Sequence, residues 1–264
     1  FDKERRPTAV AGVPPDYFSE NGQLWGNPLY DWSKHEKSKF HWWTERIRSA
    51  LRLYDMVRID HFRGFAGYWS IPAGEQTAKN GAWVKAPGEK LFLTLKKEFP
   101  KLPIVAEDLG DITPDVNELR DKFGLPGMKV LQFAFSDPDN EFLPHNFKNN
   151  FVVYTGTHDN ATTVGWFEDP EREKERKFFL HYLGLSKTTS APEAVEHMVR
   201  LAMRSVASIA IVPFQDVLKR GSEARMNTPA EAGGNWQWRM DESELSAPQD
   251  WLLEATWISG RKPK

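Results

Sequence analysis

The sequence contains no cysteine, which excludes disulfide bonds and thiolate metal sites and is typical of chains in reducing compartments. It lacks any apolar run of the roughly 18 to 20 residues needed to cross a bilayer. The first residues, FDKERRPTAV, contain neither an initiator Met nor the apolar region of a signal peptide. We therefore expect a cytoplasmic protein, or a protein of the plastid stroma if the source is a plant or alga.

A strong net charge is also missing, because 35 Lys and Arg residues oppose 37 Asp and Glu residues, a balance of −2. Nothing in this balance points to nucleic acid or an anionic membrane as a partner, and we expect neither. The compositional outlier is tryptophan, with 11 residues. Indole rings offer a flat apolar face and one polar group, which suits sugar binding, although packing in the core is the alternative.

The apolar pattern predicts strands separated by helices. Residues 1–38 are interrupted by Gly and Pro and are expected to form a long loop region. The expected helices cover 40–51, 91–99, 114–123, 171–183 and 192–206, with Thr113 as the cap of the third. The expected strands cover 56–59, 103–106, 128–135, 151–155 and 209–212. Strands that alternate with helices indicate parallel βαβ units, either in a barrel or in a doubly wound sheet.

Carboxylates follow three of the expected strands, which favours the barrel. Asp60, Glu107 and Asp159 each lie at the carboxyl end of a different strand, and in a TIM barrel that end is the catalytic face. Five strands do not close an eight-stranded barrel, so either further strands lie outside this sequence or the sheet is open. The fold prediction is an α/β chain, and the family resemblance that its motifs carry implies that it forms the C-terminal part of a (β/α)8 barrel whose N-terminal strands are absent.

Two of these carboxylates suit the cleavage of a glycosidic bond, which needs one group to protonate the leaving oxygen and one to attack or stabilise the sugar. Arg58 lies two residues before Asp60, hence on the same side of a strand, and would keep the Asp60 carboxylate ionised as a nucleophile. Glu107 follows an apolar run, and burial there would raise its pKa toward that of a general acid. A structural ion pair for Asp60 and a strand-end cap for Glu107 are the alternatives.

The third carboxylate lies in His158-Asp159-Asn160, after a glycine that permits a sharp turn. An ordinary turn is one alternative. A metal site is another, because His and Asp are both metal ligands, but the spacing matches no specific metal-binding motif. We expect no metal and no cofactor.

Together, several motifs closely resemble the 4-α-glucanotransferase family, also called amylomaltase or disproportionating enzyme, glycoside hydrolase family 77. The motifs are AGVPPDYF at 11–18, GQLWGNP at 22–28, VRIDHFRGF at 57–65, AEDLG at 106–110, THDN at 157–160, RMN at 225–227 and GNW at 234–236. The resemblance implies retaining transfer of α-1,4-glucan segments to glucose or another glucan, in starch, glycogen and maltodextrin metabolism.

The resemblance also implies roles for individual residues. Asp60 is expected to be the nucleophile, Glu107 the acid/base and Asp159 the carboxylate that holds sugar hydroxyls. Arg58 and His158 are expected to support the same sugar. The further groove residues implied by the family are Asp16, Gln23, Trp25, His61, Phe133, Asp137 and Asn227. For Trp25 a loop anchor is the alternative, and for Phe133 it is a place in the core.

Family members resemble a complete barrel about twice this length. The expected organisation is one partial barrel domain over 1–264, with a substrate-groove loop region at 1–38 and catalytic βα units at 39–264. We expect the 264 residues alone to be poorly soluble or inactive, since an open parallel sheet exposes unpaired edges. An α-glucan hydrolase of the α-amylase type and a non-catalytic glucan-binding domain are the alternative functions.

Overall fold

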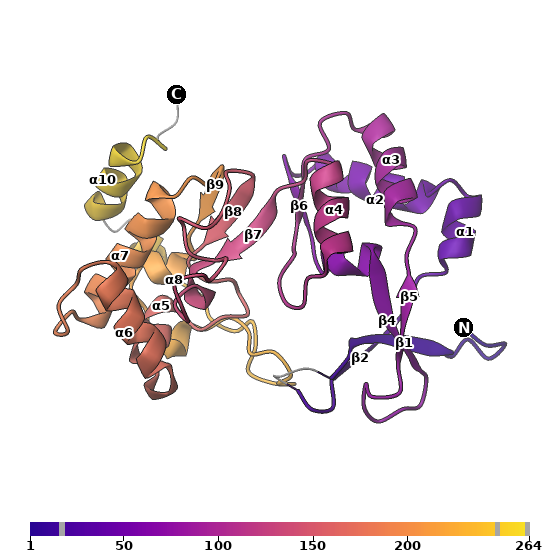
Figure 1. Cartoon of the computed structure of the whole chain (residues 1–264), viewed down its shortest axis with the longest axis horizontal. Coiled ribbons are helices and arrows are strands. Elements are labelled where there is room, and N and C mark those ends of the chain that lie inside the picture. The colour runs from indigo at the N-terminus through magenta and orange to yellow at the C-terminus, as the bar shows by residue number, and fades with distance from the viewer. Residues whose placement is uncertain (16–18, 246–248, 262–264) are drawn as a thin grey trace. The chain divides into compact units, whose positions relative to one another are not determined.

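The computed structural model describes residues 1–15, 19–245 and 249–261. The chain forms two compact units, Phe1–Gly127 and Met128–Lys264, which Figure 1 colours from indigo to magenta and from magenta to yellow. Helices and parallel strands occur in both units, and the prediction of an α/β protein is confirmed. Among the described helices, none has the length and apolar character that a membrane span requires.

A pair of short parallel strands lies at the centre of the first unit. β3 (Val57–Ile59) pairs with β6 (Ile104–Ala106), with Ile59 opposite Ala106. Around the pair are α1 (Trp32–Lys37), α2 (His41–Leu51), α3 (Gly88–Glu98) and α4 (Pro114–Lys122). The apolar faces of α2, α3 and α4 pack into the same core as the strands. Both strands and the last three helices were predicted and are confirmed.

The ends of α4 follow from its sequence. Thr113 is the residue before the helix, Pro114 takes the first helical position, and Gly124 follows the helix with a positive φ of 65°. One detail differs from the expectation that Thr113 caps the helix. Its hydroxyl donates to the Asp115 carboxylate instead of accepting a backbone N–H.

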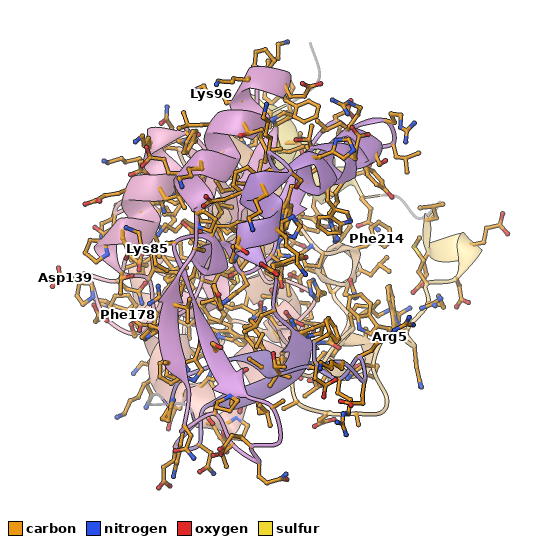
Figure 2. All side chains as sticks on the ribbon, turned by 90° about the vertical axis from the view of Figure 1, so that its right-hand side faces the viewer. Arg5, Lys85, Lys96, Asp139, Phe178 and Phe214 are labelled. Carbon is orange, nitrogen blue, oxygen red and sulfur yellow. The ribbon has the colours of Figure 1, made fainter. Side chains whose placement is uncertain are left out.

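An antiparallel sheet is the main departure from the sequence-based expectation. Its order is β2-β1-β4-β5, formed by β1 (Ala9–Val13), β2 (Gln23–Pro28), β4 (Gly67–Pro72) and β5 (Ala82–Lys85). Figure 2 labels Lys85 at the end of β5 and Lys96 in α3. The expectation of a loop region over 1–38 is therefore wrong for β1, β2 and the helix α1, and 39–264 contains more than βα units.

Local packing explains why β1 and β2 were missed. Every residue of β2 is exposed, so the strand shows no apolar alternation. The glycines that suggest loops serve close packing instead. A Cβ on Gly12 would lie 2.2 Å from the carbonyl oxygen of Gln23 on the paired strand, and Gly22 turns the chain with a positive φ of 64°.

The second unit is built on the sheet β7-β8-β9, formed by β7 (Gly127–Val130), β8 (Phe151–Tyr154) and β9 (Ile209–Ile211). Strands β8 and β9 are parallel. The strand predicted over 128–135 is shorter than expected, because the chain passes after Val130 into a 3₁₀ turn, Leu131–Phe133. The other four predicted strands are confirmed with small changes at their ends.

The helices of this unit are α5 (Thr163–Glu168), α6 (Glu173–Tyr182), α7 (Ala191–Arg204), α8 (Phe214–Val217), α9 (Glu242–Leu245) and α10 (Asp250–Ile258). Buried residues of α5, α6 and α7 share one apolar core with the sheet. Ser190 and Glu193 form a capping box at the start of α7. Trp166, Phe179 and Met198 are fully buried between these helices and the sheet, and the predicted helices at 171–183 and 192–206 are confirmed.

Candidate active site

Asp60 and Glu107 follow neighbouring parallel strands. The backbone N–H of Glu107 donates to the carbonyl of Ile59 at 2.9 Å, and the N–H of Phe62 donates to the carbonyl of Glu107 at 2.9 Å. These bonds continue the pairing of β3 and β6 past the ends of the strands. The two carboxylates, which are far apart in the sequence, are therefore held on adjacent backbone segments.

Asp60 is solvent-accessible and ion-paired. Its carboxylate oxygen Oδ1 lies 2.8 Å from Nη2 of Arg58, and its side chain is 77% exposed. The expectation that Arg58 and Asp60 lie on the same side of the strand is confirmed. Arg58 places a fixed positive charge beside an oxygen that an incoming molecule can reach.

Glu107 has the opposite environment. Its Oε2 accepts the backbone N–H of His61 at 2.6 Å, and its Oε1 accepts the N–H of Leu109 at 2.9 Å. Burial is the main effect and raises the pKa of Glu107, the negative charge of Asp60 raises it further, and the two N–H donors and Arg58 partly oppose the shift. The predicted rise in the pKa of Glu107 is confirmed. The two carboxyl groups have different surroundings, because Asp60 is exposed and Glu107 is buried.

His61 links this pair to the antiparallel sheet. Its backbone is left-handed, with a φ of 48°, which turns its N–H toward Glu107. Its ring meets the ring of Trp25 edge-on, with centroids 4.8 Å apart. Burial lowers the pKa of His61 and so favours the neutral imidazole. The indole N–H of Trp25 in turn donates to the side chain of Gln23 at 3.1 Å.

Trp25 is therefore not simply a loop anchor. It belongs to β2, is 43% exposed, and lies against the ring of His61. The structure brings six of the predicted site residues together in the first unit: Gln23, Trp25, Arg58, Asp60, His61 and Glu107. Asp16 lies outside the described residues.

The raised pKa of Glu107 leads to a pH prediction. A general acid works while it is protonated, so the raised pKa moves the alkaline limit of activity upward. Changing Asp60 to Asn removes one of the causes of the shift, so the pKa of Glu107 should fall. Infrared or ¹³C NMR titration of the Glu107 carboxyl group measures this. The same change at the exposed Asp55 should leave the titration unaltered, and an unchanged curve in Asp60→Asn would contradict the prediction.

In the second unit, three predicted site residues meet after β8. The Oδ2 of Asp159 lies 3.4 Å from Nε2 of His158, and its Oδ1 accepts the side-chain N–H of Asn227 at 2.7 Å. The backbone N–H of Asn227 donates to the carbonyl of His158 at 3.0 Å. The side chains of His158 and Asp159 are both accessible, so their polar atoms can reach a ligand.

Two further residues support this cluster. The guanidinium of Arg225 donates to the carbonyl of Asp159 at 2.7 Å and to the carbonyl of Asn227 at 2.9 Å. The ring of Trp236 lies 5.2 Å from the ring of His158, centroid to centroid. Both occur in the late motifs RMN and GNW, which point to the family but give no role to either residue.

Phe133 and Asp137 lie after β7. Phe133 is 42% exposed and packs edge-on against Phe142, so the alternative that places it in the core is wrong. The Asp137 carboxylate accepts the hydroxyl of Ser136 at 2.6 Å and the backbone N–H of Asp139 at 3.0 Å. These bonds stabilise a turn, and Phe133 remains available for contact with a ligand.

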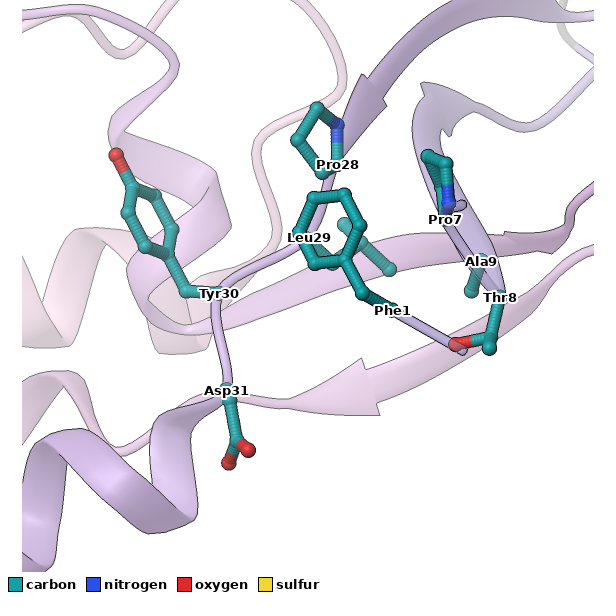
Figure 3. Close-up of a pocket in the computed structure, with 8 residues that line it drawn as sticks. All are labelled: Phe1, Pro7, Thr8, Ala9, Pro28, Leu29, Tyr30 and Asp31. Atoms are coloured by element: carbon teal, nitrogen blue, oxygen red, sulfur yellow. The ribbon is translucent and has the colours of Figure 1, made fainter. Parts of the chain in front are cut away.

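A shallow hollow of about 230 Å³ lies elsewhere in the first unit, beside the start of β1 and the end of β2. Figure 3 shows Phe1, Pro7, Tyr30 and Asp31 among its lining residues. Of the predicted site residues that the structure describes, none lines it. Within the same described ranges, no three His, Cys, Asp or Glu side chains are arranged to hold a metal ion.

The fold and the first unit's site define a class. An α/β chain with two carboxylates on adjacent parallel strand ends, one accessible beside an arginine and one buried with a raised pKa, has the equipment that glycosidic-bond chemistry uses. A family model described as 4-alpha-glucanotransferase matches residues 2–245. The chain belongs to this family, glycoside hydrolase family 77, and the resemblance stated from the motifs is confirmed.

Individual curated relatives support the same family. The chain is 55% identical over 263 residues to the 4-alpha-glucanotransferase of Thermus thermophilus, covering 97% of this chain and 52% of that protein. It is 48% identical over 266 residues to the chloroplastic/amyloplastic 4-alpha-glucanotransferase of Arabidopsis thaliana, covering 99% of this chain and 46% of that protein. The chain thus spans about half the length of the curated relatives it matches.

Solved structures with a similar fold are also known. The fold matches an amylomaltase from Streptococcus agalactiae in complex with acarbose, with a TM-score of 0.93, 41% identity, and coverage of 100% of this chain and 53% of that one. An amylomaltase from Corynebacterium glutamicum shares the fold, with a TM-score of 0.77 at 20% identity, over 97% of this chain and 42% of that one.

Proposed function

We propose that this chain carries catalytic residues of a 4-α-glucanotransferase, which transfers a segment of a 1,4-α-D-glucan to a new 4-position on glucose or another α-glucan by retaining double displacement. The observation that carries the proposal is the difference between the two carboxyl groups on adjacent strand ends. Asp60 is accessible and ion-paired with Arg58, and Glu107 is buried with a raised pKa. Family membership supplies the substrate class.

In the first step, Asp60 attacks the anomeric carbon while Glu107 gives its proton to the glycosidic oxygen. The bond between the sugar units breaks, the shortened glucan leaves with a free 4-hydroxyl, and the donor sugar remains as an ester on Asp60. In the second step, the Glu107 carboxylate takes the proton from the 4-hydroxyl of an acceptor. That oxygen attacks the anomeric carbon and Asp60 is released, so the configuration is retained.

The other site residues bind and orient sugars in this proposal. Asp159 holds sugar hydroxyls and favours the distorted transition state, and Arg58 and His158 support the same ring. His61 fixes the Glu107 carboxylate through its backbone N–H and presents Trp25. The remaining glucan contacts are Asp16, Gln23, Phe133, Asp137 and Asn227.

We further propose that the parallel strands of 1–264 belong to the C-terminal part of a (β/α)8 barrel. The support is the position of the carboxylates after strands β3, β6 and β8, which is where barrel enzymes carry their catalytic groups. A cytoplasmic or plastid-stroma location is part of the proposal. The Arabidopsis relative is named chloroplastic/amyloplastic.

Maltotriose distinguishes transfer from the alternatives, with the full-length protein as the test material. Transfer should yield glucose and longer oligomers while the number of reducing ends stays constant, because each broken glycosidic bond is replaced by another. EDTA should have no effect. A steady rise in reducing ends would support the hydrolase, and binding without any product would support the non-catalytic glucan-binding domain.

Trp25 should contribute to binding rather than to the chemical step. Trp25→Ala should raise the KM for maltotriose about 10-fold with little change in kcat, as expected when one aromatic contact is lost. Trp83→Ala is a matched control. Trp83 is also 43% exposed and lies in the same sheet, but it packs on Trp69 and beneath Arg63. Equal effects of the two variants would remove the proposed role of Trp25.

A further inference from the structure

The second unit contains a buried carboxylate that the proposed reaction does not use. Asp216 in α8 is only 1% exposed. Its Oδ1 accepts the backbone N–H of Thr163 at 2.7 Å, and its Oδ2 accepts the hydroxyls of Thr155 at 2.6 Å and Thr163 at 2.7 Å. A buried carboxylate is unfavourable unless its oxygens are satisfied, and these donors satisfy both of them.

The donors have a particular relation to Asp159. Thr155 lies four residues before Asp159, and Thr163 lies four residues after it. Asp216 therefore ties both ends of segment 155–163 to α8. His158 and Asp159, which present accessible side chains, lie in the middle of that segment.

Gln132 provides a second anchor for the same segment. Its side-chain N–H donates to the carbonyl of Ala161 at 3.0 Å, and its backbone N–H donates to the carbonyl of Thr155 at 3.2 Å. Gly156 packs so closely here that a Cβ would lie 2.7 Å from Nε2 of Gln132. Buried polar groups therefore hold the segment near its two ends, while the side chains of His158 and Asp159 in its middle stay accessible.

We propose that Asp216 is a positioning residue for the reaction, which pins segment 155–163 so that the Asp159 carboxylate is held where the sugar needs it. This inference rests on the proposed function of Asp159. Asp216 touches no substrate and acts only through the two threonines. Burial raises the pKa of Asp216, and the three hydrogen bonds oppose that shift. Keeping a carboxylate at this place has an energetic cost that apolar side chains would avoid.

The test compares variants of the full-length protein in maltotriose transfer, at a temperature where each is folded by circular dichroism. Asp216→Ala should lower kcat about 100-fold with a much smaller change in KM, the size of effect expected when a reacting group is misplaced by about 1 Å. Asp216→Asn should restore kcat to within about 5-fold of the parent. The amide oxygen can accept the N–H of Thr163, and the NH₂ group can donate to the threonine hydroxyls.

Thr155→Val gives an independent measurement if Asp216→Ala does not fold. It removes one donor to the carboxylate at similar volume and should lower kcat about 10-fold, the factor that corresponds to one hydrogen bond to a charged group. Val195→Ala is the control for lost stability. Val195 is fully buried in α7 and belongs to the apolar core, so this variant should lower Tm without lowering kcat.

Hydrogen exchange separates this inference from the proposed function. The amides of segment 155–163 should exchange faster in Asp216→Ala or Thr155→Val than in the parent or Val195→Ala, whether or not the protein transfers glucans. Unchanged exchange would overturn the anchoring. Faster exchange with kcat within about 3-fold of the parent, or an equal loss of kcat in Val195→Ala at the same Tm, would overturn the role in positioning. Absence of transfer in the parent protein would overturn the proposed function instead.

Discussion

Asp60→Asn should lower maltotriose turnover by more than about 10⁴-fold, the scale of loss seen when a covalent nucleophile is removed. The amide nitrogen and oxygen cannot form the glycosyl ester, whereas the side chain keeps its size and its place beside Arg58. Glucan binding should therefore persist. Initial rates with maltotriose and calorimetric titration with a longer maltooligosaccharide measure the two effects separately.

Asp55 offers the same substitution at a control position. It is exposed and lies just before β3, in the same unit as Asp60. Asp55→Asn should keep full turnover. An Asp60→Asn protein that retains more than about 1% of the parent turnover would contradict the assignment of Asp60 as nucleophile. Loss of glucan binding together with turnover would make a structural ion pair the better explanation.

Glu107→Gln should lower turnover of maltotriose about 10²- to 10⁴-fold, the contribution of a positioned acid and base. The glutamine oxygen can still accept one of the two N–H bonds from His61 and Leu109. It has no proton to give to a glycosidic oxygen at neutral pH. A donor with a fluoride leaving group, such as an α-maltosyl fluoride, needs no such proton, so its first step should proceed at close to the parent rate.

The glycosyl ester should then accumulate on Asp60, because no carboxylate is left to activate the acceptor hydroxyl. Mass spectrometry of the peptide that contains Asp60 should detect the added sugar. Asp60→Asn should be inactive with the fluoride donor too, which makes it the matched comparison. An equal loss in the rate of the first step with maltotriose and with the fluoride, measured for the fluoride as the initial release of fluoride ion, would argue against Glu107 as the acid.

Much of the β3-β6 and β7-β8-β9 sheets could be predicted because their signals are local. Buried strands such as Ile104–Ala106 are short apolar runs that end at a polar residue, and α2 and α4 have apolar residues at helical spacing. Strand β2 could not be predicted in this way. All its residues are exposed, and it is held by pairing with β1, a contact that only the tertiary structure supplies.

The candidate site divides in the same way. Asp60, Glu107 and Asp159 follow apolar strands, so their positions could be found from the sequence. The same rule could have found Asp216, since it comes shortly after β9, but a carboxylate that follows a strand carries no sign of whether it faces solvent or threonine hydroxyls. The contact of Trp25 with His61 joins a residue of β2 to a residue of the turn after β3, and the spacing of the two residues in the sequence does not indicate it.

The family, the α/β class and the identity of the residues suited to the reaction could be predicted without a structure, because they depend on motifs and on local apolar patterns. The surroundings of each group became known only from the folded chain. Asp60 is exposed beside Arg58, and Glu107 is buried and accepts two backbone N–H groups. Asp216 is buried and hydrogen-bonded to the segment that carries Asp159. Burial depends on residues that are distant in the chain, and together with nearby charges it governs whether a carboxyl group attacks, gives a proton or holds a loop.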